Sequence, residues 1–311
     1  MIARLATALL ASTTLLFSTA LAAPATRRDD LGVTALPGDE ISTFSPFTLI
    51  ASAAYCAADV TSTWTCGSDC EALPGFHVTA SGGDGGGIQY WFVAYSEASK
   101  SVVVAHQGTD PTEFLSVLTD LKFFLEKPNA TLFPGVSENV MMHGGFLQAY
   151  ASTADIIFDK VQQTMQQYNT TIVHSVGHSL GGALALLEAY SLRLRLPEGT
   201  TFKVVTYGMP RVGNQDFADA IDKALPDLTR ITNKSDPIPI VPGRRMGFVH
   251  PHGEVHIDHD NNWIECPGQD SEDPQCTVSN VSMFPFQWNI IDHLGYYGQV
   301  VIQCWGILSR S

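Results

Sequence analysis

Apolar and polar positions along the chain show two patterns, one typical of strands and one typical of helices. Residues 88–95 and 101–105 are rich in β-branched and aromatic side chains and predict two strands separated by a turn. Across residues 150–168 the apolar side chains recur every three or four positions, which is the period of one buried helix face. Strand-like runs alternate with helical ones, so the pattern favours an α/β sheet. The glycine-rich residues 82–87 precede a strand, and we expect a loose hairpin connection there and no phosphate-binding loop.

One strand-like run and one helix-like run meet at a serine. Residues 171–176 are β-branched, residues 183–194 read as a helix, and Ser179 lies between them with glycine two positions away on each side. This Gly-x-Ser-x-Gly pattern is typical of a nucleophile elbow, a turn so tight that its serine is strained and its neighbours are glycines. The helix that follows points its positive end at the place where an oxyanion forms. The alternative is an ordinary helix-capping serine.

A serine nucleophile needs a histidine base and a carboxylate that orients it. In hydrolases with this elbow the carboxylate and then the histidine follow the serine along the chain. Asp236 comes just after the strand-like residues 228–232, at the strand end where α/β active sites form, although an aspartate before proline is also common in turns. The carboxylates considered are Asp216, Asp236, Asp258 and Asp292.

Five histidines follow the serine: His250, His252, His256, His259 and His293. Polar residues occupy alternate positions across 250–260, so in a strand they would share one face. We expect a solvated strand face there, with incidental metal uptake as the alternative. His293 lies in a late loop and is the favoured catalytic base.

Several segments together resemble the fungal class 3 lipase family, which includes triacylglycerol lipases and type A feruloyl esterases. The likeness extends over residues 44–305, and the segments that carry it are 103–109, 143–146, 177–182, 207–213, 236–239 and 292–297. The resemblance implies a single α/β-hydrolase-like domain with a mostly parallel central sheet and a short lid helix. It also implies a catalytic triad of Ser179, Asp236 and His293.

The same resemblance assigns an oxyanion hole to the backbone N–H groups of Thr109 and Leu180. It places a lid helix at about residues 112–119, whose apolar side chains are Phe114, Leu115, Val117 and Leu118. A fixed helix that keeps these residues in the core is the alternative. The chain departs from the family at His106-Gln107, where relatives often carry an arginine. Backbone donors do not depend on that side chain.

Six cysteines allow 15 pairings, and one Cys-x-x-x-Cys spacing without a second pair is weak evidence for zinc. The family resemblance implies three disulfides: Cys56 with Cys304, Cys66 with Cys70, and Cys266 with Cys276. Sequons at Asn129, Asn169, Asn233 and Asn280 are candidate glycosylation sites.

The chain begins with a segment typical of secretion. Residues 1–22 carry one arginine, an apolar run and a small-residue cleavage site, and residues 23–28 end in a dibasic pair that is typical of a propeptide. A membrane anchor is disfavoured because serine and threonine dilute the run. Residues 29–311 would then be one catalytic domain. The composition is 45% hydrophobic and 15% charged, so the chain can form a globular core.

These observations predict a secreted carboxylic ester hydrolase, with triacylglycerol lipase as the first candidate and an ester at a lipid-water interface as its partner. The net charge of −14 disfavours nucleic acid, and we expect no metal, no organic cofactor and no stable membrane anchor. A feruloyl, aryl or short-chain carboxylesterase is the alternative within the class. A secreted binding protein that has lost catalysis is the alternative outside it, and the presence of all three triad residues argues against it.

Overall fold

A computed structural model describes residues 32–109, 124–281, 288–296, 300–301 and 304. Within these residues a nine-stranded sheet has the order β1-β11-β10-β9-β8-β7-β4-β3-β2. Its centre consists of five parallel strands: β4 (Ser101–His106), β7 (Ile172–His178), β8 (Thr201–Tyr207), β9 (Leu228–Asn233) and β10 (Glu254–Ile257). Antiparallel strands flank them: β1 (Thr34–Ala35), β11 (Trp263–Glu265), β3 (Trp91–Ser96) and β2 (Phe76–Gly82).

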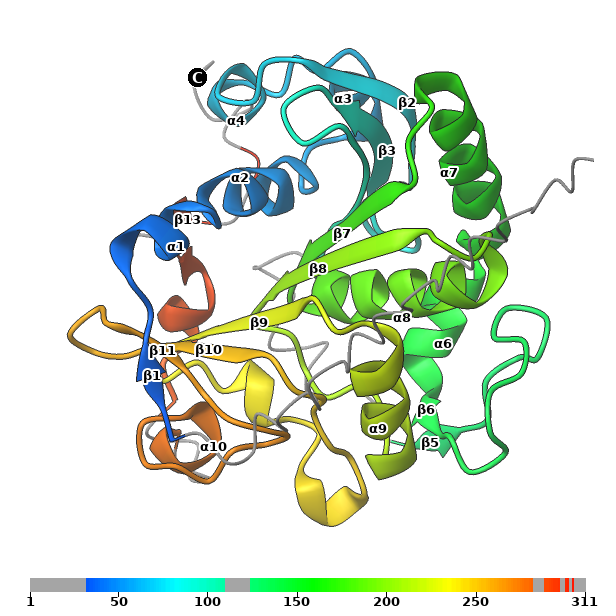
Figure 1. The fold of residues 1–311 in the computed structure, drawn as a ribbon. Helices are drawn as coiled ribbons and strands as arrows, with labels where there is room; N and C mark the ends of the chain where they lie inside the picture. The colour runs from blue at the N-terminus through cyan, green and yellow to red at the C-terminus, as the bar shows by residue number, and fades with distance from the viewer. Residues whose placement is uncertain (1–31, 110–123, 282–287, 297–299, 302–303, 305–311) are drawn as a thin grey trace, which may run out of the picture.

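The helices lie on both sides of the sheet, with α2 on one side and α8 on the other (Figure 1). They are α1 (Gly38–Ser42), α2 (Ser45–Ala53), α3 (Ala58–Ser62), α4 (Ser68–Glu71), α6 (Gly144–Ala151), α7 (Ala154–Tyr168), α8 (Leu180–Arg195), α9 (Gln215–Ala224) and α10 (Thr277–Asn280). Two short hairpins pair β5 (Leu125–Glu126) with β6 (Met142–His143) and β12 (Gly295–Tyr296) with β13 (Val300–Val301). Short 3-10 turns cover Ile238–Ile240, Arg244–Met246 and Ile290–His293. The chain therefore forms the α/β sandwich that its pattern predicts.

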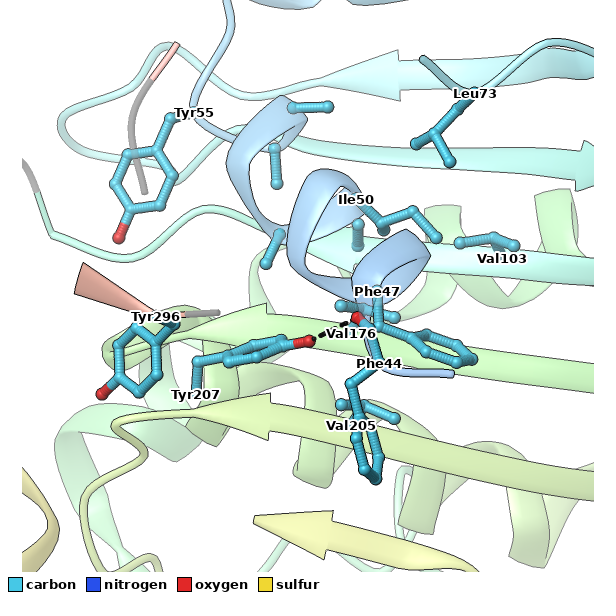
Figure 2. Packing of buried hydrophobic residues seen from close by; sticks show 14 of the residues in the cluster. Phe44, Phe47, Ile50, Tyr55, Leu73, Val103, Val176, Val205, Tyr207 and Tyr296 are labelled. Carbon is cyan, nitrogen blue, oxygen red and sulfur yellow. Dashed lines mark hydrogen bonds between the residues drawn. The ribbon is translucent and has the colours of Figure 1, made fainter. Parts of the chain in front are cut away.

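Alternation along the strands fills a separate core on each face of the sheet. In β4, Val103 and Ala105 pack with the α2 side, whereas Val102 and Val104 pack with the side of α7 and α8. Figure 2 shows the α2 side, where the Tyr207 hydroxyl donates to the carbonyl oxygen of Phe44 at 3.1 Å. Strand β4 is buried along its whole length, and its run of Val102, Val103 and Val104 is why it was visible in the sequence.

Most predicted elements are confirmed, with shifted ends. Helix α7 buries Ala154, Ile157 and Val161 along one face, as its periodicity predicts. The glycine-rich residues 82–87 do connect two antiparallel strands, β2 and β3. Strand β3 begins at Trp91 and not at residue 88, because the Asp84 carboxylate accepts the N–H of Ile88 at 2.9 Å and holds that residue in the turn.

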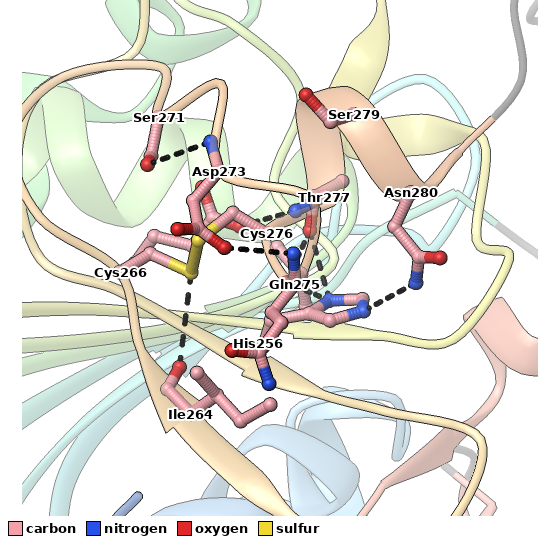
Figure 3. Close-up of a disulfide and its surroundings, with 12 residues drawn as sticks. His256, Ile264, Cys266, Ser271, Asp273, Gln275, Cys276, Thr277, Ser279 and Asn280 are labelled. Atoms are coloured by element: carbon pink, nitrogen blue, oxygen red, sulfur yellow. Dashed lines mark hydrogen bonds between the residues drawn. A yellow bond between two sulfur atoms is a disulfide. The ribbon is translucent and has the colours of Figure 1, made fainter. Parts of the chain in front are cut away.

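The prediction of a solvated strand face across residues 250–260 is wrong. Strand β10 is interior, between β9 and β11, and all four of its residues are buried. His256 is fully buried and contacts the hydroxyls of Thr232 and Thr277 at 2.9 and 3.0 Å, and its Nε2 accepts from Asn280 at 2.9 Å (Figure 3). These polar side chains are satisfied inside the protein, which alternation alone could not reveal.

The structure contains the three disulfides that the family resemblance implies: Cys56–Cys304, Cys66–Cys70 and Cys266–Cys276. The last one joins the end of β11 to the start of α10 beside His256 (Figure 3). Because Cys66 is bonded to Cys70, that pair offers no thiolate for zinc.

One glycosylation candidate needs correction. Asn129, Asn169 and Asn280 are exposed, although the Asn280 amide donates to His256 at 2.9 Å, and Asn233 is only 5% exposed. The Asn233 amide donates to the carbonyl oxygens of Asp292 and Gly295 at 2.8 and 2.5 Å, so a glycan on Nδ2 would break both hydrogen bonds. The predicted signal segment 1–22, the predicted propeptide 23–28 and the predicted lid residues Phe114, Leu115, Val117 and Leu118 lie outside the described residues. In the part of the chain that is described, no helix has the length and apolarity needed to cross a membrane.

Candidate active site

Ser179 occupies a strained turn between β7 and α8. Its φ of 59° and ψ of −129° lie in a region that non-glycine residues rarely adopt, and its N–H donates to the Tyr207 carbonyl oxygen at 2.8 Å. The turn is possible because both neighbours at two positions lack a side chain. A Cβ on Gly177 would overlap the Gly181 carbonyl group, and one on Gly181 would lie 2.7 Å from the Gln107 carbonyl oxygen. The elbow geometry therefore follows from this sequence.

His293 and Asp236 form a buried pair. His293 Nδ1 lies 2.8 Å from Asp236 Oδ2, and the two residues are 1% and 0% exposed. Asp236 stands three residues beyond the end of β9, and His293 ends a 3-10 turn. The carboxylate also accepts the Tyr296 hydroxyl on Oδ2 at 3.0 Å and the Ile238 N–H on Oδ1 at 2.9 Å. Three donors, His293, Tyr296 and Ile238, fix the orientation of the Asp236 carboxylate.

His178, immediately before the serine, holds the backbone of His293. Its Nε2 donates to the His293 carbonyl oxygen at 2.7 Å, and its Nδ1 accepts the Tyr55 hydroxyl at 2.6 Å. Burial, and then the nearby His293, keep the pKa of His178 well below 6.5, so the ring stays neutral with one donor and one acceptor. Sequence reasoning gave His178 no role, although its place next to Ser179 was the available signal.

Two further residues make room for this arrangement and tie it to the sheet. Gly208 has a φ of +55°, and a Cβ there would lie 2.5 Å from the Tyr296 hydroxyl and 2.8 Å from the His293 ring. The two hydrogen bonds of Asn233 fasten the end of β9 to the loop that carries His293. Sequence reasoning assigned no site role to Gly208 or Tyr296, and it indicated Asn233 only as a glycosylation candidate. Their roles depend on contacts between distant segments.

The other carboxylates considered have different partners. Asp258 accepts the N–H groups of Asp260 and Asn262 in a tight turn, and Asp292 accepts the N–H of Ser235 at 3.1 Å. Asp216 lies in the first turn of α9. The competing histidine His250 is buried and donates to the Pro239 carbonyl oxygen at 2.9 Å. Among these residues, the structure brings Asp236 and His293 together.

The residues assigned to an oxyanion hole lie on two sides of the elbow. Leu180 is the first residue of α8, so its N–H has no acceptor within the helix. Gly108 packs against the elbow, because a Cβ there would lie 2.6 Å from the His178 carbonyl oxygen and 3.0 Å from Ser179 Cβ. Thr109 follows Gly108 directly and is the last described residue of its segment.

Within the described ranges, one group of three residues of the kinds that bind metal ions lies close together. Glu254, Cys266 and Cys276 have ligand atoms within 4.8 Å of one another. The two cysteines form a disulfide, so neither offers a thiolate to a metal.

The fold and the elbow together define the chain as an α/β hydrolase. Known proteins then place it more narrowly. The family model described as "Lipase (class 3)" matches residues 103–246. The secreted mono- and diacylglycerol lipase MDL3 of Malassezia globosa is 35% identical over 218 residues, which are 69% of this chain and 69% of that protein. The chain belongs to the class 3 lipase family, as the sequence motifs predict.

Solved structures agree with this assignment. The triacylglyceride lipase of Rhizomucor miehei superposes with a TM-score of 0.75 at 27% identity, covering 88% of this chain and 100% of that chain. The Lip2 lipase of Yarrowia lipolytica superposes with a TM-score of 0.75 at 26% identity, covering 86% of this chain and 97% of that chain. The likeness extends well beyond the elbow motif.

Proposed function

We propose that this chain is a secreted serine ester hydrolase that cleaves acylglycerols, with Ser179 as nucleophile, His293 as base and Asp236 as its carboxylate. The observation that carries the proposal is the buried Asp236–His293 pair at 2.8 Å, in a chain whose strained elbow presents a serine. A carboxylate on Nδ1 leaves the other ring nitrogen, Nε2, to exchange protons with the serine and substrate. Inactive binding proteins have no need of this costly arrangement.

In the acylation step the Ser179 oxygen attacks the ester carbonyl carbon while its proton moves to Nε2 of His293. The imidazolium that forms lies beside the Asp236 carboxylate, which stabilises it. The carbonyl oxygen becomes an oxyanion, which the N–H groups of Leu180 and Thr109 receive. When the tetrahedral intermediate collapses, the bond to the alcohol oxygen breaks and His293 gives that oxygen its proton.

In the deacylation step water takes the place of the alcohol. His293 removes a proton from the water, whose oxygen attacks the acyl carbonyl carbon. The second tetrahedral intermediate releases the carboxylic acid, and Ser179 recovers its proton from the imidazolium. Because His293 must be neutral to begin either step, acid should reduce the rate.

The substrate class has two candidates. Triacylglycerol is the first, because the family resemblance and the Rhizomucor miehei neighbour both point to it. Monoacylglycerol and diacylglycerol are the second, favoured by the names of the Malassezia relatives, which are mono- and diacylglycerol lipases. The names of those relatives and residues 1–22 also support secretion of this chain.

A substrate panel tests the proposal. Purified protein should hydrolyse emulsified monoacyl-, diacyl- and triacylglycerols and p-nitrophenyl esters faster than methyl ferulate. A preference for methyl ferulate would instead support the esterase alternative. Absence of hydrolysis on every ester would contradict the proposed function.

The four apolar lid residues supply a second test, based on sequence alone. We propose that Leu115 and Leu118 contact lipid, so activity on a triacylglycerol emulsion should rise steeply above the solubility limit. The double variant Leu115→Asp with Leu118→Asp should weaken that rise more than it weakens hydrolysis of dissolved short-chain esters. Equal losses on both substrates would contradict the lipid contact.

A further inference from the structure

A second buried carboxylate-histidine pair lies between β4 and α8, outside the proposed triad. Glu188 is 0% exposed and His106 is 2% exposed, with Glu188 Oε2 3.6 Å from His106 Nε2. Among the described residues, no partner lies within normal hydrogen-bond distance of the carboxylate oxygens or of that ring nitrogen. His106 and Tyr150 are the hydrogen-bonding side chains that face the carboxylate, at a longer distance. Burying polar groups at this longer distance offsets only part of their desolvation. The contact between the two side chains is therefore weaker than a normal hydrogen bond, and stability alone is a poor reason for it.

Charged and titratable groups from several elements surround Glu188. His106 faces it from β4, Tyr150 from α6 and Arg195 from the next turns of α8. Arg195 is itself bound to Asp155 of α7 at 2.8 Å. Burial raises the pKa of Glu188 above its ordinary value of 4.5, while His106 and Arg195 act in the opposite direction. The Glu188 carboxyl group and the His106 imidazole attract each other across this distance.

His106 is the point where β4 turns into the loop of the oxyanion hole. It is the last residue of β4, on the same face as Val102 and Val104, which pack toward α7 and α8. The next residue, Gln107, is held from the other side: its N–H donates to the Tyr90 carbonyl oxygen and its Oε1 accepts the Tyr90 N–H, both at 2.8 Å. The loop is thus fixed at two consecutive side chains before it reaches Thr109.

Helix α8 carries the other half of the oxyanion hole. Leu180 begins this helix and Glu188 lies a little more than two turns further along it, so the two residues move as parts of one rigid rod. The main chain of residues 106 and 107 also packs directly against the elbow at Gly181. The contact between His106 and Glu188 therefore joins the two elements that supply the two backbone donors.

We propose that Glu188 and His106 are positioning residues, which hold the end of β4 against α8 and so set the separation between the N–H groups of Thr109 and Leu180. The proposal rests on the proposed function, because it concerns the oxyanion hole of that site. It also gives a role to the histidine at a position where this chain departs from the family pattern.

The first experiment compares two substitutions of Glu188 on a soluble p-nitrophenyl ester. Glu188→Leu removes the polar contact and should lower kcat roughly tenfold, a part of the 100-fold or more that loss of a whole oxyanion donor costs. KM should change less than twofold. Glu188→Gln keeps the shape and a hydrogen-bonding group, and it should retain kcat within about threefold of the wild type. Ser191→Ala is the matched control. Ser191 lies in the same helix as Glu188 and donates a buried hydrogen bond to the Leu132 carbonyl oxygen, and its loss should leave kcat unchanged.

Inhibitors separate positioning from a general structural defect. An alkylboronic acid binds the serine as a tetrahedral adduct with an oxygen in the oxyanion position, so Glu188→Leu should weaken it by the same factor as kcat/KM. A long-chain alcohol forms no oxyanion, and its inhibition constant should stay within twofold. Equal weakening of both inhibitors would overturn the positioning role.

If Glu188→Leu does not fold, the double variant His106→Leu with Glu188→Leu replaces the pair by apolar side chains and keeps the core free of an unpaired charge. It should fold and show the same tenfold loss in kcat. A folded double variant with wild-type kcat would overturn the inference. Failure of the proposed function looks different, because the wild type would then hydrolyse no ester or would tolerate Ser179→Ala.

Discussion

The molecule buries two carboxylate-histidine pairs in contrasting ways. Asp236 receives three hydrogen bonds, one of them from His293 at 2.8 Å, whereas no partner lies within normal hydrogen-bond distance of the Glu188 oxygens among the described residues, and His106 is 3.6 Å away. The first pair comes from loops beyond the strand ends, and the second from the last residue of strand β4 and the middle of helix α8. The difference indicates that the two pairs have different roles. The pair with many hydrogen bonds fixes a carboxylate beside its histidine, whereas the other pair only joins two elements.

The substitution expected to have the largest effect on activity is Asp236→Asn, in the first pair. An amide cannot hold the His293 tautomer or stabilise its positive charge, so kcat on a p-nitrophenyl ester should fall about 10⁴-fold. Asp258→Asn is the matched control, because Asp258 caps a turn and contacts neither His293 nor Ser179 in the structure. A larger loss in the Asp258 variant would reassign the carboxylate.

Tyr296→Phe tests how much the hydrogen bond from Tyr296 to Asp236 contributes to the activity of the Asp236–His293 pair. The change removes the hydroxyl that donates to Asp236 Oδ2 at 3.0 Å and keeps the ring that packs against Tyr207. Loss of one hydrogen bond to a charged group should lower kcat roughly tenfold. Wild-type kcat in this variant, alongside an inactive Asp236→Asn, would show that the remaining donors suffice.

The smallest expected effect that distinguishes the two pairs is the pH dependence of the free energy of unfolding. Burial raises the pKa of Glu188, so the folded state holds this proton more tightly than the unfolded chain does. Its contribution to stability is therefore present below about pH 4.5 and is lost as pH rises through the folded-state pKa. The glutamine in Glu188→Gln does not titrate. Near pH 7 the free energy of unfolding of this variant should exceed that of the wild type by about 1 kcal/mol, the scale of one buried polar group.

Denaturant titrations at pH 4 and pH 7 measure this difference. The advantage of Glu188→Gln should shrink at pH 4, where the wild-type carboxyl is protonated. Asp236→Asn should show no such gain at pH 7, because it exchanges a well-satisfied carboxylate for an amide. Equal behaviour of the two variants would contradict the contrast between the pairs.

The sequence predicted the parts of this molecule that depend on local chemistry. The glycines around Ser179 identified the elbow because a turn of that shape excludes side chains on both sides. Asp236 and His293 followed from chain order and from the resemblance to class 3 lipases. Strands β4, β7 and β9 were visible because they are rich in β-branched residues.

Contacts between distant segments were not predictable in this way. His256 alternates with apolar residues as an exposed residue would, yet α10 supplies it with polar partners inside the protein. Asn233 fits a glycosylation pattern, yet its amide is used by the loop that carries His293. Glu188 looks like one polar residue in an apolar helix, and only the fold shows that His106 faces it.

The central claim is that Ser179 is the nucleophile, and hydrolysis of a soluble p-nitrophenyl ester by Ser179→Ala tests it most directly. The variant loses only a hydroxyl, so it should fold like the wild type by circular dichroism. Its kcat should fall by a factor on the order of 10⁴ or more. A folded Ser179→Ala variant that keeps more than about a tenth of wild-type kcat would contradict the account, since no triad enzyme loses its nucleophile at so small a cost.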